Sequence, residues 1–222
     1  MTHDITKDQY LQDPCGTCAT AFWKNAFFKK PHGTKVVHQA NMNDITADGM
    51  QIERYFRLVH RLKDIAPHSL PANYYFQTVN IQSQLSTVAH FLNNCYDNFF
   101  ITADQVEKWT KYMVFDNSLW LFVYSLSSSY PVALGIADID KTIKEGSLEW
   151  IQTLPDARGK GIGAALVTEL LLRLLPKADF ATVSGLADSE FKPEALYRKC
   201  GFVGEDIWCV LAPTRNLDCK LA

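Results

Sequence analysis

Apolar residues follow helical spacing in some parts of the chain and form short strand-like runs in others. Residues 85–91 carry apolar side chains at helical spacing, and Thr102-Ala103-Asp104 has the residue types that start a helix. Apolar runs at residues 74–79, 119–124 and 132–137 predict strands. The serine-rich turn between the last two runs predicts that they form a hairpin.

The second half of the chain alternates between strand-like and helix-like segments. Its pattern predicts, in order, a strand at residues 148–154, a helix at 162–175, a strand at 180–184, a short helix at 193–199 and a strand from Phe202 onward. Pro176 stops the long helix. No internal repeat interrupts this order.

Ala66-Pro67-His68-Ser69-Leu70-Pro71 interrupts both helix and strand with two prolines and small polar residues. Before this stretch, the pattern predicts helices at residues 21–28 and 52–62 and a short strand at 35–38. The chain is therefore divided into a mostly helical N-terminal extension, residues 1–71, and a main domain, residues 72–222.

Composition and charge exclude several kinds of partner. The 222 residues are 47% hydrophobic and 21% charged, which suits an ordinary globular core. A net charge of -2 gives no general attraction to nucleic acid or to anionic lipid, so neither is an expected partner. The first seven residues lack the pattern of a secretion signal, which predicts a cytoplasmic protein. Glu169 and Arg173 interrupt the most apolar helix, so no membrane span is expected.

Six cysteines are present, and a cytosolic chain of this size does not need to pair them. Cys15-Gly16-Thr17-Cys18 is a C-x-x-C turn, which can serve redox exchange, bind zinc or hold two packed residues. A redox motif normally follows a strand, and no strand is predicted before this turn. His32 and His38 are spaced too widely to complete a zinc site. Packed residues, or residues that cap the start of a helix, are the preferred interpretation, and no metal is expected.

The stretch DARGKGIGAAL, residues 156–166, joins a predicted strand to a predicted helix. The first amides of a helix are unpaired and lie at the positive end of its dipole, so such a junction binds phosphate groups when side chains do not obstruct it. Glycines remove the obstruction, and Arg158 and Lys160 add positive charge. A glycine-rich turn without a ligand is the alternative.

Two other phosphate-binding motifs fit this stretch less well. Gly159, Gly161 and Ala164 satisfy the loose dinucleotide fingerprint, but residues 155–158 separate them from the strand and only one strand–helix unit follows. The lysine-containing P-loop pattern is absent from the sequence.

Residues 158–164 resemble the Arg/Gln-x-x-Gly-x-Gly/Ala pyrophosphate loop of the GNAT superfamily, the acyl-CoA-dependent N-acyltransferases. Residues 148–154 resemble the central strand of that family, and residues 196–202 resemble its late Leu-Tyr-x-x-x-Gly-Phe signature. Glu190 and Pro193 depart from the residues often found ahead of that signature. The resemblance runs from about Tyr74 to Pro213 and implies a bacterial-type GNAT α/β fold, an α+β mixed sheet, with an N-terminal extension.

The resemblance also implies that acetyl-CoA is the co-substrate. Its pyrophosphate would lie on the glycine loop, and its pantetheine arm would run beside the strand at residues 148–154. Backbone amides of that strand would polarise the thioester carbonyl. The residues expected to contact the cofactor are Ile151, Gln152, Thr153, Arg158, Gly159, Lys160, Gly161, Ile162, Gly163 and Ala164.

Two side chains are expected to carry the chemistry. Strand alternation puts Glu149 on one face with Ile151 and Thr153, opposite Leu148, Trp150 and Gln152, where it could act as general base. An ordinary solvated or salt-bridged glutamate is the alternative. The resemblance places Tyr197 as the acid that protonates the departing thiolate. The alternative is a packed helix tyrosine, with Gly201 ending the helix in a left-handed cap.

The implied function is transfer of an acetyl group to a primary amine by direct attack, so Cys200 is expected to be a small buried residue and not a nucleophile. Acidic residues at Asp138, Asp140, Glu149 and Asp188 would suit a cationic acceptor, either a small molecule or a peptide. The protein could form a homodimer. The N-terminal extension could shape the acceptor side of the site or form an interface. Two other functions remain: a CoA-binding sensor without turnover, and a thiol oxidoreductase at Cys15 and Cys18.

Overall fold

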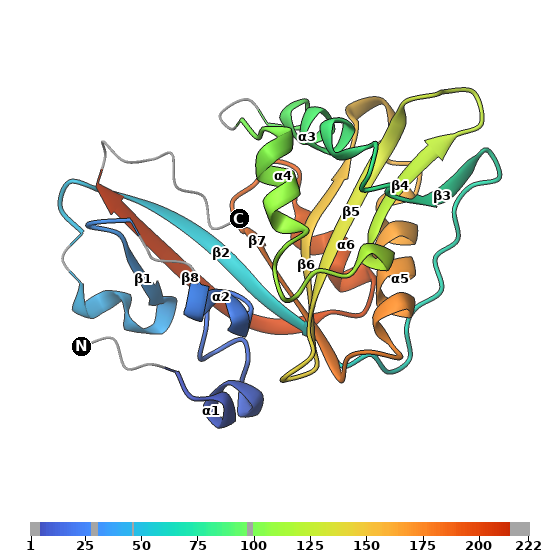
Figure 1. The fold of residues 1–222 in the computed structure, drawn as a ribbon. Coiled ribbons are helices and arrows are strands. Elements are labelled where there is room, and N and C mark those ends of the chain that lie inside the picture. Colours follow the sequence, from blue (N-terminus) through green and yellow to red (C-terminus); the bar gives the residue numbers. More distant parts are fainter. Residues whose placement is uncertain (1–4, 28–30, 46, 97–99, 214–222) are drawn as a thin grey trace.

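The structure is a computed structural model that describes residues 5–27, 31–45, 47–96 and 100–213. Eight strands of these residues form a mixed sheet in the order β1-β8-β2-β7-β6-β5-β4-β3 (Figure 1). Neighbouring strands are antiparallel, except β6 and β7, which are parallel. The strands are β1 (Lys35–His38), β2 (Met50–His60), β3 (Tyr74–Thr78), β4 (Trp120–Ser125), β5 (Pro131–Asp140), β6 (Glu145–Thr153), β7 (Phe180–Leu186) and β8 (Val203–Pro213).

Helices cover both faces of the half of the sheet that contains β3 to β6. The helix α5 packs on one face, where Leu166 and Leu170 join a buried cluster with residues of β5, β6 and β7. On the other face, Phe91 of α3 and Val106 of α4 are buried with aromatic residues of β4. The helices are α1 (Lys7–Gln12), α2 (Phe22–Phe27), α3 (Leu85–Asn93), α4 (Ala103–Trp109), α5 (Ile162–Leu174) and α6 (Pro193–Lys199), with short 3-10 turns η1 (Gln39–Asp44), η2 (Asn117–Leu119) and η3 (Pro155–Ala157).

The elements predicted after residue 71 are confirmed. They correspond to β3, α3, α4, the β4–β5 hairpin, β6, α5, β7, α6 and β8. The helix start at Thr102 is a capping box, in which Thr102 Oγ1 accepts a hydrogen bond from Gln105 N at 3.2 Å and Gln105 Oε1 accepts one from Thr102 N at 2.8 Å. This reciprocal pair fixes the first turn of α4 by local interactions.

The front segment differs from the prediction in one major element. The helix α2 and the strand β1 are confirmed, although Phe28 lies outside the described residues. The predicted helix at residues 52–62 is wrong, because residues 50–60 form β2 between β7 and β8. The last five residues of β2 are all buried. This part of the strand therefore lacks the alternation of buried and exposed residues that predicts a strand from sequence. The description of residues 1–71 as mostly helical is therefore wrong, and the division at residue 71 stays a prediction.

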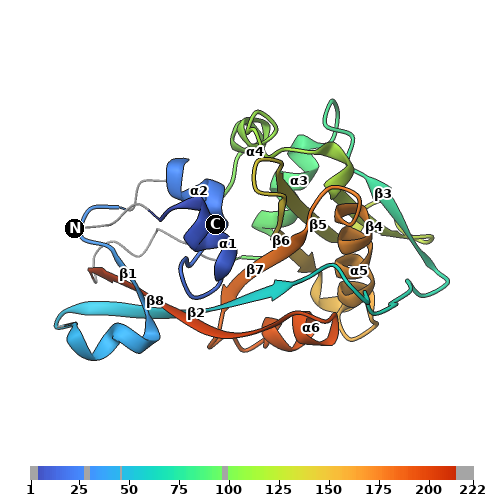
Figure 2. The ribbon, with the colours of Figure 1, turned by 90° about the horizontal axis from the view of Figure 1, so that it is seen from below.

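A buried polar group attaches the front segment to the sheet. Tyr10 of α1 donates a hydrogen bond to Glu145 Oε1 at 2.5 Å, and Arg57 Nη2 of β2 donates one to the Tyr10 hydroxyl at 2.8 Å. The backbone amide of Phe22 donates to Glu145 Oε2 at 3.0 Å. These contacts hold α1 and α2 together beside the sheet (Figure 2), which fixes the position of the side chains that α2 carries.

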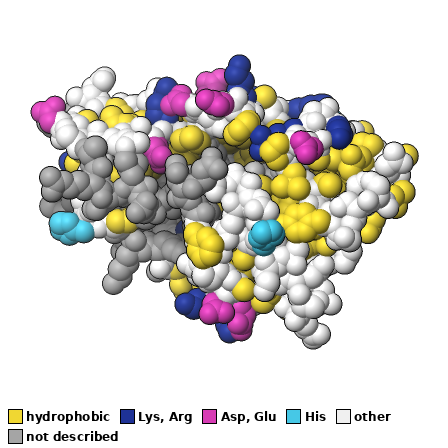
Figure 3. Space-filling view, turned by 90° about the horizontal axis from the view of Figure 1, so that it is seen from above, with side chains coloured by type: hydrophobic (Ala, Val, Ile, Leu, Met, Phe, Trp, Pro, Cys, Tyr) yellow, Lys and Arg dark blue, Asp and Glu magenta, His cyan; other side chains and the backbone are white. Residues whose placement is uncertain are grey.

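The sequence also predicted free thiols and no membrane span. Cys15, Cys18, Cys95, Cys200 and Cys209 are free thiols, whereas Cys219 lies outside the described residues. In the part of the chain that the structure describes, no helix has both the length and the apolar character that a membrane span requires. Hydrophobic side chains are nevertheless visible on the face nearest α3, with charged side chains mainly at its edges (Figure 3).

Candidate active site

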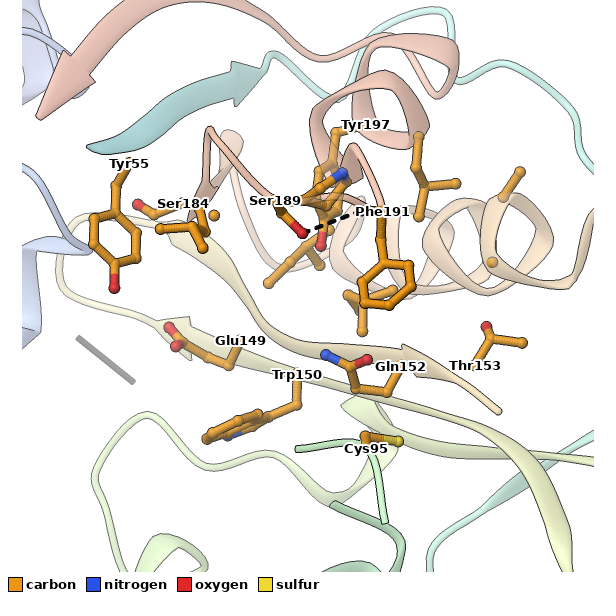
Figure 4. A pocket seen from close by; sticks show the side chains of 18 of the residues that line it. Tyr55, Cys95, Glu149, Trp150, Gln152, Thr153, Ser184, Ser189, Phe191 and Tyr197 are labelled. Atoms are coloured by element: carbon orange, nitrogen blue, oxygen red, sulfur yellow. Dashed lines mark hydrogen bonds between the residues drawn. The ribbon is translucent and has the colours of Figure 1, made fainter. Parts of the chain in front are cut away.

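A cleft opens where β6 and β7 separate. The two strands pair only from Glu145 opposite Phe180 to Leu148 opposite Val183, although β6 continues for five further residues. The resulting cleft has a volume of about 750 Å³ and is lined by β6, the glycine loop, α6, β7 and the front segment. In Figure 4, Glu149, Trp150, Gln152 and Thr153 of β6 lie on one wall, and Tyr197, Ser189 and Phe191 lie on the opposite wall.

A β-bulge places Glu149 in this cleft. Ile136 of β5 faces Trp150 and Ala137 faces Leu148, so Glu149 is an extra residue without a partner position on β5. The predicted alternation is therefore wrong here. Leu148 joins the cluster beneath α5, whereas Trp150 packs on the α3 and α4 side. Strict alternation assumes one residue opposite each partner, and the bulge breaks that assumption.

The glycine loop forms the other end of the cleft. Gly159 has φ 73° and Gly161 has φ 83°, a left-handed conformation that favours glycine. An added Cβ at either position would meet no atom within 4 Å, so the loop leaves open space in front of its backbone. Gly161 is the N-cap of α5, and the amides that follow it have no acceptor within the helix. This geometry suits a phosphate group.

The two cations of the loop occupy different positions. Arg158 lines the cleft, where its Nε donates a hydrogen bond to Thr153 O at 3.1 Å and its guanidinium lies 4.2 Å from the centre of the Phe191 ring. Lys160 does not line the cleft, and its Nζ donates to Asp156 O at 2.7 Å. All other residues expected to contact the cofactor line the cleft, and their roles stay predictions.

Tyr197 lies on α6 in the wall opposite β6. It is 7% exposed and packs near Phe56 and Phe202, with ring centroids 6.0 and 5.7 Å away. Burial raises the pKa of the Tyr197 hydroxyl well above its usual value, which keeps the phenol protonated as a hydrogen donor at neutral pH. Gly201, with φ 91°, ends α6 in the left-handed conformation that the sequence predicted.

Glu149 pairs with a residue that the sequence analysis did not identify. Lys24 Nζ of α2 donates to Glu149 Oε2 at 2.5 Å, and the two side chains are only 11% and 14% exposed. Glu149 is thus a salt-bridged glutamate in the cleft. Burial raises the pKa of the neighbouring Asp138, and the negative charge of Glu149 raises it further while Lys24 lowers it. Glu149 therefore interacts electrostatically with both Lys24 and Asp138.

Tyr96 also lines the cleft and was not predicted. Gln152 Nε2 donates a hydrogen bond to the Tyr96 hydroxyl, and burial raises the pKa of Tyr96 to about 12. No local pattern in the sequence could have identified Tyr96 or Lys24, because each reaches β6 from a separate segment of the chain. The expected role of Gln152 through its backbone stays a prediction.

Cys15, Cys18 and Cys200, three of the cysteines that the structure describes, are packed in the interior. Cys15 and Cys18 are 3% and 4% exposed and pack in a cluster with Tyr10 and Phe180, as the preferred interpretation predicted. Burial raises the pKa of Cys15 to about 12, whereas a redox thiol requires a lowered pKa. Cys200 is fully buried and burial raises its pKa to about 11, so its thiol stays protonated.

The described residues contain no group of three or more His, Cys, Asp or Glu side chains that could hold a metal ion.

Comparisons with known proteins agree with this arrangement. Residues 122–204 match the family model described as an acetyltransferase (GNAT) domain, and no curated protein matches the chain. A GCN5-related N-acetyltransferase from Sphaerobacter thermophilus is similar in structure, with 15% identity and a TM-score of 0.67; the match covers 80% of this chain and 58% of that one. The chain thus spans less than two thirds of that protein.

Two further structures have the same fold. A tandem GNAT protein from the clavulanic acid biosynthesis pathway is 13% identical with a TM-score of 0.58, and the match covers 81% of this chain and 63% of that one. A chain of the NatC complex bound to Gag peptide and CoA is 12% identical with a TM-score of 0.52, and the match covers 64% of this chain and 98% of that one. Residues 122–204 therefore match a GNAT acetyltransferase domain, and the resemblance to that family and the α/β mixed fold that the sequence predicted are confirmed.

Proposed function

We propose that this protein transfers an acetyl group from acetyl-CoA to a primary amine. The observation that carries the proposal is the cleft between β6 and β7, which joins a glycine-loop phosphate site to two facing walls, one with Glu149 and the other with Tyr197. A structurally similar chain belongs to a complex that contains CoA, which supports the choice of co-substrate. The acceptor is a small molecule or a peptide.

The residues present fit coenzyme A. The start of α5 and the open space at Gly159 and Gly161 suit a pyrophosphate, and Arg158 supplies positive charge nearby. Residues 151–153 of β6 extend beyond the segment that pairs with β7. An extended pantetheine arm would lie along this edge as an added strand does, held by backbone groups.

The reaction forms a bond between the acceptor nitrogen and the acetyl carbonyl carbon and breaks the bond between that carbon and sulfur. Glu149 accepts the proton that the attacking amine loses, directly or through water. Backbone amides of β6 near Ile151 stabilise the negative charge that develops on the carbonyl oxygen. Tyr197, which is protonated at neutral pH, donates a proton to the departing thiolate.

Calorimetric titration with acetyl-CoA tests the cofactor assignment. We expect binding of about micromolar strength, about -8 kcal/mol, in the natural protein and its loss in Gly161→Glu, whose carboxylate would occupy the open space and repel the pyrophosphate. Gly49→Glu is the matched control, because Gly49 has a similar φ of 71°, equally open surroundings and no place in the cleft. Equal binding by all three proteins, or by none, would overturn the assignment.

Turnover is tested by thiol release from acetyl-CoA in the presence of a panel of primary amines. Release that depends on an amine supports the transferase. Binding of acetyl-CoA without release by any amine would favour the alternative, a CoA-binding sensor. The oxidoreductase alternative is disfavoured by the burial and the raised pKa of Cys15.

A further inference from the structure

Lys24 is a primary amine held inside the proposed catalytic cleft. Its Nζ donates to Glu149 Oε2 at 2.5 Å, and its side chain lines the same cleft as Ile151 and Tyr197. The side chain is 11% exposed, so its amine faces the cleft and not the surrounding solvent. The proposed reaction requires an amine in hydrogen-bond contact with the general base, and Lys24 has that contact.

The backbone that carries Lys24 is firmly held. The Phe22 amide donates to Glu145 Oε2 at 3.0 Å, and the neighbouring Trp23 is 5% exposed. Glu145 also accepts from Thr182 at 2.5 Å in the buried polar group that fastens α1 and α2 to the sheet. A fixed amine beside a reaction centre reacts far faster than the same amine free in solution, because its orientation is set in advance.

We propose that Lys24 is an intramolecular acetyl acceptor, so that the protein acetylates its own front segment. The inference rests on the proposed function. Lys24 Nζ starts as an ammonium, transfers one proton to Glu149 along their hydrogen bond and attacks the acetyl carbonyl carbon. Nζ then loses a second proton, which passes through water to restore Tyr197. A bond forms between Nζ and this carbon, the bond between carbon and sulfur breaks, and the thiolate takes a proton from Tyr197. The products are Nε-acetyl-Lys24 and free CoA.

Acetylation of Lys24 would also change the charge of the cleft. The amide product carries no charge, so the ion pair between Lys24 and Glu149 is lost. Glu149 is then available to an external amine, and the self-acetylated protein is expected to use external acceptors more readily than the Lys24→Arg variant, which keeps a cation beside Glu149. The acetylation state of Lys24 in the front segment would therefore control how readily the cleft acetylates external amines.

Site selectivity separates this reaction from chemical acetylation in solution. Lys111 is 67% exposed and forms a surface pair with Glu107, so a reagent that attacks from solvent reaches it easily. The Lys24 side chain is only 11% exposed, so a reagent in solvent reaches it less easily. Preference for Lys24 over Lys111 is therefore a property that only the protein's own cleft supplies.

The test is incubation of the full chain with acetyl-CoA that carries carbon-13 in both acetyl carbons, followed by peptide mass spectrometry. We expect heavy acetyl on Lys24 at least about tenfold faster than on Lys111. The rate constant should not depend on protein concentration. Glu149→Gln should slow the labelling of Lys24 by about 10²-fold, while Lys111→Arg should leave it unchanged. Calorimetric binding of acetyl-CoA by each variant verifies that its cleft is intact.

Mixing the Glu149→Gln variant with Lys24→Arg protein tests transfer between molecules. Heavy acetyl on Lys24 of the Glu149→Gln variant, at the rate of the natural protein, would overturn the intramolecular route. If the natural protein binds acetyl-CoA and acetylates an external amine while Lys24 stays unlabelled, the inference falls and the proposed function stands. If it binds no acetyl-CoA, both fall.

Discussion

Arg57 Nη2 lies 3.3 Å from Glu145 Oε1, and the two side chains are 2% and 0% exposed. Arg57 comes from β2 in the front segment, whereas Glu145 begins β6, 88 positions later. The pair joins two distant parts of the chain beneath the cleft. Removal of one charge would leave the other buried without its partner, which is costly in a low-dielectric interior.

Arg57→Met is expected to lower the free energy of unfolding by about 3–5 kcal/mol. The matched control is Arg54→Met, because Arg54 lies on the same strand but is 44% exposed and 3.7 Å from Asp188. Loss of such a surface pair costs about 0–1 kcal/mol. Urea unfolding of the three proteins measures both effects, and equal losses in the two variants would contradict the buried ion pair.

Tyr197→Phe is expected to lower kcat by about 10²-fold without changing the affinity for acetyl-CoA. Phenylalanine keeps the packing against Phe56 and Phe202 and removes only the hydroxyl. Because burial raises the pKa of Tyr197 above 10, its ionisation should not reduce the rate of the natural protein below pH 10. Tyr124→Phe, which removes a buried hydroxyl outside the cleft, is the control. An undiminished kcat in Tyr197→Phe would remove Tyr197 from the mechanism.

His60 makes the stability of the protein sensitive to acid. Its Nδ1 accepts a hydrogen bond from Leu62 N at 2.9 Å, and burial lowers its pKa below 6.5. The unfolded chain therefore binds a proton at His60 more readily than the folded chain. This contribution to stability is complete above pH 6.5 and decreases as the pH falls toward the lower pKa of the folded state.

We expect the urea midpoint of the natural protein to fall more steeply with acidification below pH 6.5 than that of His60→Asn, which keeps an acceptor for the Leu62 amide but does not titrate in this range. His90→Asn is the control on an exposed side chain. Parallel pH profiles for the natural protein and His60→Asn would show that His60 does not contribute.

Thiol reagents should distinguish the cysteines of the cleft from those of the core. Cys95 lines the cleft and has a pKa raised to about 11, whereas Cys15 is 3% exposed with a pKa raised to about 12. At pH 8 the thiolate fraction of Cys15 is thus about tenfold lower. We expect Cys95 to react first and acetyl-CoA to protect it. Faster reaction of Cys15, read by peptide mass spectrometry, would revive the redox alternative.

Features that depend on neighbouring residues could be predicted from the sequence alone. The helix start at Thr102 follows from a capping box within four residues, and the glycine loop follows from residues that adopt a left-handed conformation before α5. The short helix α6 has the predicted bounds, because Pro193 begins it and Gly201 ends it. Each of these signals involves only a few neighbouring residues, so it can be recognised in the sequence without knowledge of the fold.

The way in which distant segments combine at the site depends on the three-dimensional fold and could not be predicted from the sequence. β2 is a strand because β7 and β8 provide partners on both sides, and its buried residues carry no periodic signal that separates strand from helix. The bulge at Glu149 depends on the register with β5, a relationship between strands that no single segment contains. Lys24 reaches Glu149 across 125 positions because the buried group around Glu145 fixes α2 beside β6. Such contacts are specified by packing between segments, and a local pattern cannot reveal them.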